Sequence, residues 1–181
     1  MSIKESGLIL DELDKTMTLI SEDQIDSLIE KIRAHKRIFV YATGRSGLMI
    51  KAFAMRLMQM GLTAYVVGET TTPSLQKEDL LILASSSGTT KSVCDYADSA
   101  KKMGADLAII TSDAASYLSE HFDVTISVKA DSKYAGGGNS KQPMGSLFEQ
   151  ALLIIFDTAI MKMVENRETA QYMQHNHANL E

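Results

Sequence analysis

The chain has 181 residues, a length that suits one ordinary domain and is short for two. Its 45% hydrophobic and 23% charged residues are typical of a globular protein, which excludes a disordered chain, a coiled coil and a disulfide scaffold. The net charge of −5 and the lack of a basic run argue against nucleic-acid binding, although a helix N-terminus can still bind one small anion. A single cysteine, Cys94, with no signal peptide and no membrane-spanning stretch, indicates a cytoplasmic protein without membrane contact.

The hydrophobic pattern predicts two opening helices, followed by five strands that alternate with helices. Apolar residues at helical spacing predict a helix around residues 8–20, and a capping box formed by Ser21 and Gln24 starts a second one that continues to Ile32. Short apolar runs predict strands at residues 38–42, 64–67, 80–84, 107–110 and 124–128. Further helices are predicted at 48–60, up to Met103 after the third strand, at 114–121 and at 145–165. Residues 129–144, with glycines at 136–138, are predicted to form a polar loop.

Strands that alternate with helices at this spacing predict right-handed crossovers and a parallel sheet covered on both faces. We therefore expect an α/β fold of three layers, a doubly wound, flavodoxin-like sheet of five parallel strands in the order 2-1-3-4-5. N-terminal helices and a long C-terminal helix complete it. Because no repeat and no linker-like segment is present, one domain is expected over residues 1–181. It would comprise a helical extension at 1–36, the sheet core at 37–165 and a polar tail at 166–181.

Two loops rich in glycine and hydroxyl side chains follow the first and third strands, which flank the switch point of such a sheet. Each loop leads into a helix whose first N–H groups and dipole attract anions, and the hydroxyls add donors. The two loops are therefore predicted to bind one phosphate group. The residues expected to bind it are Gly44, Arg45, Ser46, Ser85, Ser86, Ser87, Gly88 and Thr90.

Two alternatives to a phosphate site remain open at this point. Ser and Thr are common helix caps, so part of the hydroxyl cluster can be explained by capping alone. Dinucleotide binding is the other alternative, because Glu69 stands near the end of the second strand, where an acid could bind a ribose. However, residues 42–47 lack the first glycine of the dinucleotide fingerprint. No spacing of His and Cys residues indicates a metal site.

Four segments of the chain resemble the 6-phospho-3-hexuloisomerases, a family of the sugar isomerase (SIS) domain superfamily. They are residues 44–47 (GRSG), 85–90 (SSSGTT), 142–150 (QPMGSLFEQ) and 177–181 (HANLE). The resemblance covers nearly the whole chain. The second segment is specific only to SIS domains, whereas the last two narrow the match to this family.

The resemblance implies an isomerase that interconverts 3-hexulose 6-phosphate and fructose 6-phosphate, a step of the ribulose monophosphate pathway of formaldehyde fixation. It implies no metal and no organic cofactor, with a sugar phosphate as substrate. Because related enzymes are homotetramers, we expect a homo-oligomer, a tetramer built from dimers. The alternatives are an SIS module that binds a sugar phosphate without catalysis, as in regulators, and another aldose–ketose isomerase of the superfamily. The roughly 36 residues before the first strand are too few for the DNA-binding domain that such regulators carry.

Two residues are candidates for the acid–base chemistry that the resemblance implies. Moving a carbonyl from C3 to C2 passes through an enediol(ate), and one carboxylate above both carbons can carry the proton. Glu149 matches the acidic residue of the family segment, although Ser146 and Glu149 also fit a capping box. His177 heads the family-like terminus and is expected to assist ring opening or to polarise the C2 and C3 oxygens, in its own or a neighbouring subunit's site.

The helices predicted at 48–60 and 145–165 are apolar on nearly all sides. A helix that covers one face of a sheet normally has a polar side as well. Both helices are therefore expected to be deeply buried or, in a domain this small, to pack against another subunit.

Overall fold

The computed structural model describes residues 3–130, 140–164 and 166–179, and its elements follow the predicted order. Its helices are α1 (Lys4–Met17), α2 (Glu22–Ala34), α3 (Gly44–Gln59), α4 (Lys91–Met103), α5 (Tyr117–His121), α6 (Ser146–Met163) and α7 (Arg167–His175). Its strands are β1 (Arg37–Ala42), β2 (Thr63–Val66), β3 (Leu80–Ser85), β4 (Asp106–Thr111) and β5 (Val124–Ser127). The three glycines predicted to lie in a loop at 136–138 are outside the described residues.

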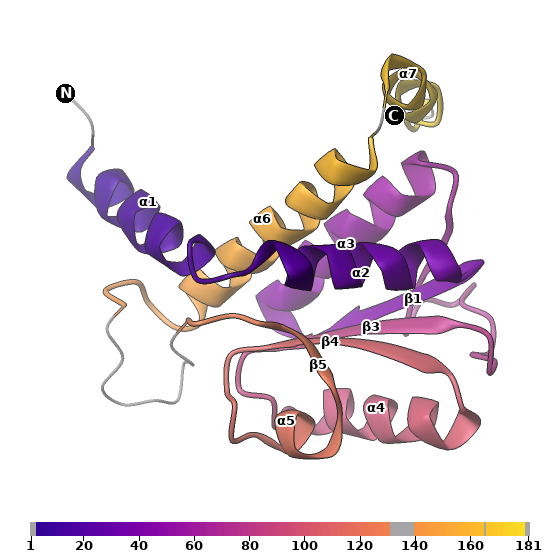
Figure 1. The fold of residues 1–181 in the computed structure, drawn as a ribbon, viewed down its shortest axis with the longest axis horizontal. Helices are drawn as coiled ribbons and strands as arrows, with labels where there is room; N and C mark the ends of the chain where they lie inside the picture. The colour runs from indigo at the N-terminus through magenta and orange to yellow at the C-terminus, as the bar shows by residue number, and fades with distance from the viewer. Residues whose placement is uncertain (1–2, 131–139, 165, 180–181) are drawn as a thin grey trace.

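The five strands form one parallel sheet in the order β2-β1-β3-β4-β5, which confirms the predicted doubly wound α/β fold. Helices α2, α3 and α6 cover one face of the sheet, and α4 and α5 cover the other (Figure 1). Helix α1 packs against α6 instead of the sheet, and α7 lies beside the C-terminal end of α3. Among the described helices, none combines the length and hydropathy that a membrane span requires.

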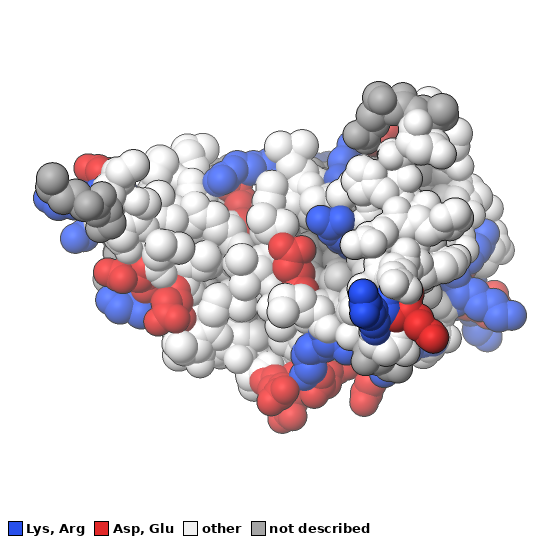
Figure 2. Space-filling view, turned by 90° about the horizontal axis from the view of Figure 1, so that it is seen from above, with Lys and Arg blue, Asp and Glu red and all other residues white. Residues whose placement is uncertain are grey.

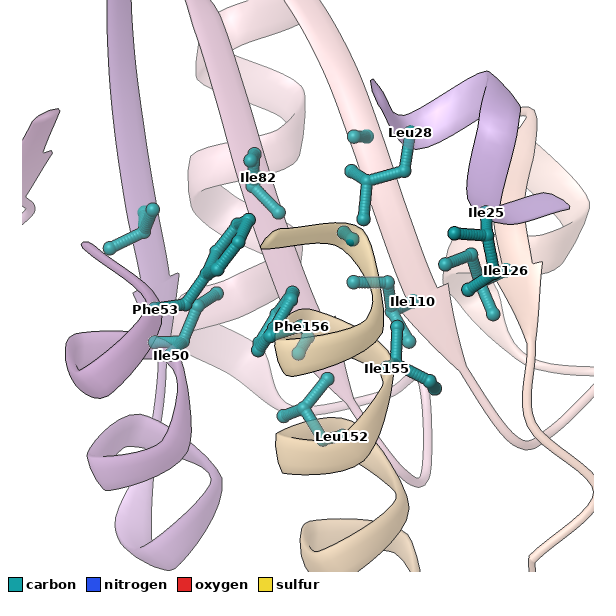
Figure 3. Close-up of a cluster of buried hydrophobic side chains, with 14 of the residues drawn as sticks. Ile25, Leu28, Ile50, Phe53, Ile82, Ile110, Ile126, Leu152, Ile155 and Phe156 are labelled. Carbon is teal, nitrogen blue, oxygen red and sulfur yellow. The ribbon is translucent and has the colours of Figure 1, made fainter. Parts of the chain in front are cut away.

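The apolar runs of the strands are buried because both faces of the sheet are covered. In β3, the side chains of Leu80 and Ile82 belong to the core between the sheet and helices α2, α3 and α6. Leu81 and Leu83 belong to the core on the opposite face, between the sheet and α4. Figure 3 shows the first of these cores, between the sheet and the helices above it. Phe53 of α3 and Phe156 of α6 stack there, with ring centroids 4.2 Å apart and planes inclined by 7°. This contact packs α3 against α6, the two most apolar of the described helices.

The structure differs from the sequence prediction at several helix boundaries and by one additional helix. Helix α1 spans Lys4–Met17 and not residues 8–20, and α5 begins at Tyr117 and not at residue 114. Helix α3 begins at Gly44, four residues before the predicted start, because Thr43 is extended and Gly44 takes a left-handed conformation with φ of 60°. The polar tail contains a helix, α7, which Asn166 caps by accepting a 2.9 Å hydrogen bond from the N–H of Thr169. None of the residues of α7 is buried and most of them are polar, so the segment was interpreted as a polar tail.

Candidate active site

The two hydroxyl-rich loops lie side by side at the carboxyl end of the sheet. They meet because β1 and β3 are neighbours, with Ala42 paired to Ala84 at the last register position. A cavity of about 90 Å³ opens between them and the start of α6. Seven of the eight predicted phosphate ligands line it, together with Glu149; they are Gly44, Arg45, Ser46, Ser85, Ser86, Ser87 and Thr90.

Sequence reasoning missed four further residues that line the same cavity, namely Thr43, Ala84, Gly145 and Phe148. All four are sequence neighbours of residues that the prediction named. Thr43 and Ala84 stand where the two strands end, and Gly145 and Phe148 belong to the family-like segment at 142–150. The position of these segments was the available signal for Ala84, Gly145 and Phe148, whereas the hydroxyl of Thr43, next to Gly44, could also have been counted among the donors.

Hydroxyl groups organise the loop between β3 and α4 from within. The buried Ser85 Oγ lies 2.9 Å from Thr90 Oγ1 and accepts a 3.2 Å hydrogen bond from the N–H of Gly88. Ser87 Oγ accepts from the N–H of Thr89 at 3.4 Å. Thr90 occupies the N-cap position of α4, but its side chain makes no capping hydrogen bond. Ordinary capping therefore does not account for this cluster.

The hydroxyl of Ser86 stands out because it is buried and has no hydrogen-bond partner within the described part of the chain. A buried hydroxyl that lacks a partner is unfavourable, and native structures contain few of them. Ser86 lines the cavity, so a ligand there can supply the missing partner. Ser112 has a similarly buried hydroxyl without a described partner, but it does not line this cavity.

Gly88, the remaining predicted ligand, shapes the loop and does not line the cavity. Its φ of 60° is left-handed, and a Cβ placed on it would come within 2.0 Å of Ser116 Oγ. The turn therefore brings the backbone of the loop directly against the start of α5. Only glycine meets both requirements at this position.

Glu149 points toward the cavity and does not cap its own helix. The N-cap of α6 is Gly145, and Ser146 Oγ donates to the carbonyl of Pro143 at 2.7 Å. Arg45 Nη1 donates to Glu149 Oε2 at 2.8 Å, so an ion pair joins the start of α3 to the first turn of α6 across the cavity. The second carboxylate oxygen, Oε1, has no hydrogen bond to any described residue. The side chain is 16% exposed, whereas that of Arg45 is 49% exposed.

His177 lies far from this cavity within its own chain. It follows α7, where Asn176 Nδ2 donates to the carbonyl of Gln59 at 3.0 Å, at the C-terminal end of α3. Arg45 stands at the opposite end of that helix. Because α3 has 16 residues, its two ends are about 22 Å apart. The structure thus brings Glu149 to the phosphate loops and keeps the imidazole of His177 at the other end of the same helix.

The structure also bears on a dinucleotide site at Glu69 and on a metal site. Glu69 accepts a 2.7 Å hydrogen bond from Lys51 Nζ and lies outside the cavity between the loops, so it is not placed beside a phosphate bound there. Within residues 3–130, 140–164 and 166–179, no group of three or more His, Cys, Asp or Glu side chains is arranged to hold a metal ion.

Comparison with known proteins extends these observations. The model of the SIS domain family matches residues 31–154. A 3-hexulose-6-phosphate isomerase of Bacillus subtilis is 42% identical over 176 residues, which cover 96% of this chain and 95% of the relative. A protein of the same name from Mycobacterium gastri is 39% identical, with 97% and 89% covered. The crystal structure of a Methanococcus jannaschii protein, for which 3-hexulose-6-phosphate isomerase function was inferred, superposes with a TM-score of 0.84 at 34% identity. The match covers 99% of this chain and all of that one.

Proposed function

The chain belongs to the SIS domain family and groups within it with the 3-hexulose-6-phosphate isomerases, and from this premise we propose that it interconverts 3-hexulose 6-phosphate and fructose 6-phosphate. One observation carries the proposal. A single cavity contains both a hydroxyl-rich loop suited to a phosphate and a carboxylate, Glu149, that is held by Arg45. Binding and proton transfer can therefore occur in one place.

The loop between β3 and α4 binds the phosphate of the substrate. A phosphate monoester has three acceptor oxygens and nearly two negative charges at neutral pH. The N-terminus of α4 offers N–H groups and a partial positive charge, and Ser86, Ser87 and Thr90 offer hydroxyl donors around the cavity. The Ser86 hydroxyl gains a partner in this complex, which favours the bound state further.

Glu149 is the base that carries the proton between C2 and C3. In the direction of fructose 6-phosphate, the carboxylate takes the proton from C2, and the C3 carbonyl becomes part of an enediol(ate). The same proton returns to C3 while the C2 carbonyl forms and the proton of the C2 hydroxyl moves to O3. Arg45 holds Oε2 of the carboxylate, which leaves Oε1 for the substrate. General acid–base catalysis of this kind contributes about 10²–10⁴-fold to the rate.

His177 acts in the site of a neighbouring copy of the chain. The distance of about 22 Å along α3 separates it from the cavity of its own chain. Its chemistry follows from the two sugars. With O6 phosphorylated, the 3-keto sugar cannot close a five- or six-membered ring on C3, whereas fructose 6-phosphate closes one through O5 onto C2. Imidazole is needed for ring opening from the fructose side, or to polarise the C2 and C3 oxygens.

A homo-oligomer, as expected for a tetramer built from dimers, also accounts for the uncovered sides of α3 and α6. Leu48, Met55 and Met58 form an exposed apolar stripe along α3, and Met161 of α6 is 76% exposed. Figure 2, which looks onto this helical side of the molecule, shows that charged residues are sparse there. A second copy that packs along α3 in the antiparallel direction would set the tail of one chain beside the cavity of the other.

Replacing Glu149 by glutamine tests the role of the base. Glu149→Gln keeps the size of the side chain and an acceptor for Arg45 but removes the basic oxygen. We expect kcat to fall by about 10²–10⁴-fold, while sugar-phosphate binding remains close to that of the parent. Glu30→Gln, at an exposed position of α2, is the control for the loss of one negative charge. A Glu149→Gln protein that isomerises 3-hexulose 6-phosphate at the parent rate would exclude Glu149 as the base.

Two buried hydroxyls offer a matched test of the phosphate site. Ser86→Ala and Ser112→Ala each remove a buried hydroxyl without a described partner, so neither should destabilise the fold. Only Ser86 lines the cavity. We expect Ser86→Ala to raise the Kd for fructose 6-phosphate measured by calorimetry and Ser112→Ala to leave it unchanged. Equal affinities of both variants and the parent would contradict the assignment of the phosphate to this loop.

Mixing inactive variants tests whether His177 works across subunits. His177→Ala and Glu149→Gln proteins are purified separately, dissociated, mixed and reassembled. If the two residues of one site come from different chains, some mixed oligomers contain one intact site and activity returns. No recovery in oligomers shown to be mixed would mean that both residues must lie in the same chain.

A further inference from the structure

The first helix of the chain holds the segment that leads into α6. The carboxylate of Glu12 in α1 receives three hydrogen bonds from residues 140–142, which follow it by about 130 positions in the sequence. Oε1 accepts from the backbone N–H of Lys141 at 2.8 Å, and Oε2 accepts from Ser140 Oγ at 2.8 Å and from Gln142 Nε2 at 3.1 Å. We call this group of contacts the Glu12 clamp.

The contacts of the clamp favour the ionised form of Glu12. The N–H of Lys141 is the main cause that lowers the pKa of this carboxyl below its ordinary value, and burial opposes the shift. The side chains of Ser140 and Gln142 add to the lowering. A carboxylate that accepts from a backbone N–H and two side chains fixes the positions of all three groups. The clamp is thus specific for the conformation of residues 140–142.

The segment between the clamp and the helix is short and constrained. Its conformation is unusual, because Met144 has a φ of 59° although it is not glycine, and its side chain is 76% exposed. Such a backbone persists only where surrounding contacts enforce it. On the helical side, the carbonyl of Pro143 accepts from the N–H and Oγ of Ser146. On the other side, Gln142 is held by the clamp and by a 3.1 Å hydrogen bond from its N–H to Ser140 Oγ, which is itself bound to Glu12.

This segment sets the position of Glu149. Gly145 lines the cavity, and its carbonyl accepts a 3.1 Å hydrogen bond from the N–H of Glu149. The Glu149 carboxylate lies directly beside it, since a Cβ on Gly145 would be 3.7 Å from Oε1. A change in the path of residues 142–145 therefore moves the start of α6 and the carboxylate together. The phosphate loop after β3 makes none of these contacts.

We propose that Glu12 is a positioning residue that aims Glu149 at the substrate by clamping residues 140–142. The proposal rests on the proposed function of Glu149 as the base. Because misplacing a reacting group by about 1 Å can reduce the rate by 10²-fold, the clamp acts on turnover. We expect the clamp to leave phosphate binding unchanged, because the phosphate loop follows β3, whereas residues 140–142 precede α6. The amide of Gln142 takes part by reaching a carboxylate of another helix.

Exchanging the two interacting side chains provides the test. We expect Glu12→Gln to lower kcat by about 10- to 100-fold with KM nearly unchanged, because glutamine keeps only one of the two acceptor oxygens and so loses the hydrogen bond from Lys141 or those from Ser140 and Gln142. Gln142→Glu, which sets two carboxylates against each other, should have a similar effect. The double variant Glu12→Gln/Gln142→Glu restores a donor–acceptor pair and should recover most of kcat. Glu5→Gln, an exposed glutamate two turns earlier on α1, is the control and should behave like the parent.

A readout independent of catalysis separates the clamp from the role of Glu149. Hydrogen exchange of the Lys141 amide should accelerate in Glu12→Gln and slow again in the double variant, whether or not Glu149 is the base. The proposal would be overturned if Glu12→Gln had the kcat of the parent, or if its KM rose by the same factor by which kcat falls. A folded double variant that recovers no activity would also overturn it. If Glu149→Gln retains full activity while the exchange of Lys141 behaves as expected, the base assignment fails and the clamp contact stands.

Discussion

Replacing Gly88 by alanine tests how strictly the phosphate loop is shaped by its contact with α5. An alanine would need the left-handed conformation that Gly88 adopts, and its Cβ would lie 2.0 Å from Ser116 Oγ and 2.4 Å from Ser116 Cβ. Ser116 is buried and caps α5 by accepting from the N–H of Ser119. Rotating its hydroxyl away would sacrifice the cap without relieving the contact with Cβ. Conformational strain, loss of the cap and overpacking together predict a destabilisation of about 3–6 kcal/mol.

Gly44 provides the matched control for this substitution. It has the same φ of 60°, but a Cβ on it would meet no other atom within 4 Å. Gly44→Ala should therefore lose only the conformational contribution of about 1–2 kcal/mol. Urea unfolding of both variants at one protein concentration measures the difference, which the contact with Ser116 should place at about 2–4 kcal/mol. Equal losses in the two variants would refute the view that this contact shapes the loop.

Three further predictions concern the stability of the fold that carries the site. Arg37→Met removes the guanidinium that donates to the buried Asp79 at 2.7 Å. Urea unfolding should show that the free energy of unfolding falls by about 3–5 kcal/mol, and a fall below about 1 kcal/mol would contradict this prediction. Burial raises the pKa of Asp79, but hydrogen bonds from Arg37 and the N–H of Gln76 outweigh it and lower the pKa below its ordinary value. The stabilisation from Asp79 should thus be complete above about pH 4 and be lost as the pH falls through the lowered pKa, which unfolding at pH 2–7 would detect. Phe156→Ala removes a buried ring stacked on Phe53 and should destabilise by about 3–5 kcal/mol in the same assay, and Phe156→Leu should lose clearly less.

The fold was predictable because its strands are buried on both faces. Leu80 to Ala84 are all apolar and all buried, so a plain run of β-forming residues was sufficient to predict β3 without alternation. The strand order then followed from the crossover rules, and that order alone placed the two loops next to each other. The start of α3 was predicted less well, since Gly44 begins the helix in a conformation that no hydrophobic pattern reports.

Contacts between distant segments could not be predicted. The spacing of Ser146 and Glu149 fits a capping box as well as a base, and no local rule decides between them. The structure shows only that the capping box does not form, because Arg45, which is 104 residues away, holds the Glu149 carboxylate at the cavity. Glu12 was likewise inconspicuous, an acidic residue on an amphipathic helix, until the fold placed it against residues 140–142. Neither contact leaves a trace in one sequence, because Arg45, Glu149 and Glu12 each look like an ordinary surface charge there.

The structure gives the proposed oligomer a geometric reason that the sequence did not. Arg45 and the cavity lie at one end of α3, and the tail with His177 lies at the other. The exposed apolar stripe of α3 connects these two ends. In a two-fold contact each copy uses the same surface, so two α3 helices that pack in opposite directions align the start of one with the end of the other. The burial of Leu48 and Met55 in such a contact would favour assembly, and the same assembly would bring each tail to a cavity that its own chain cannot reach.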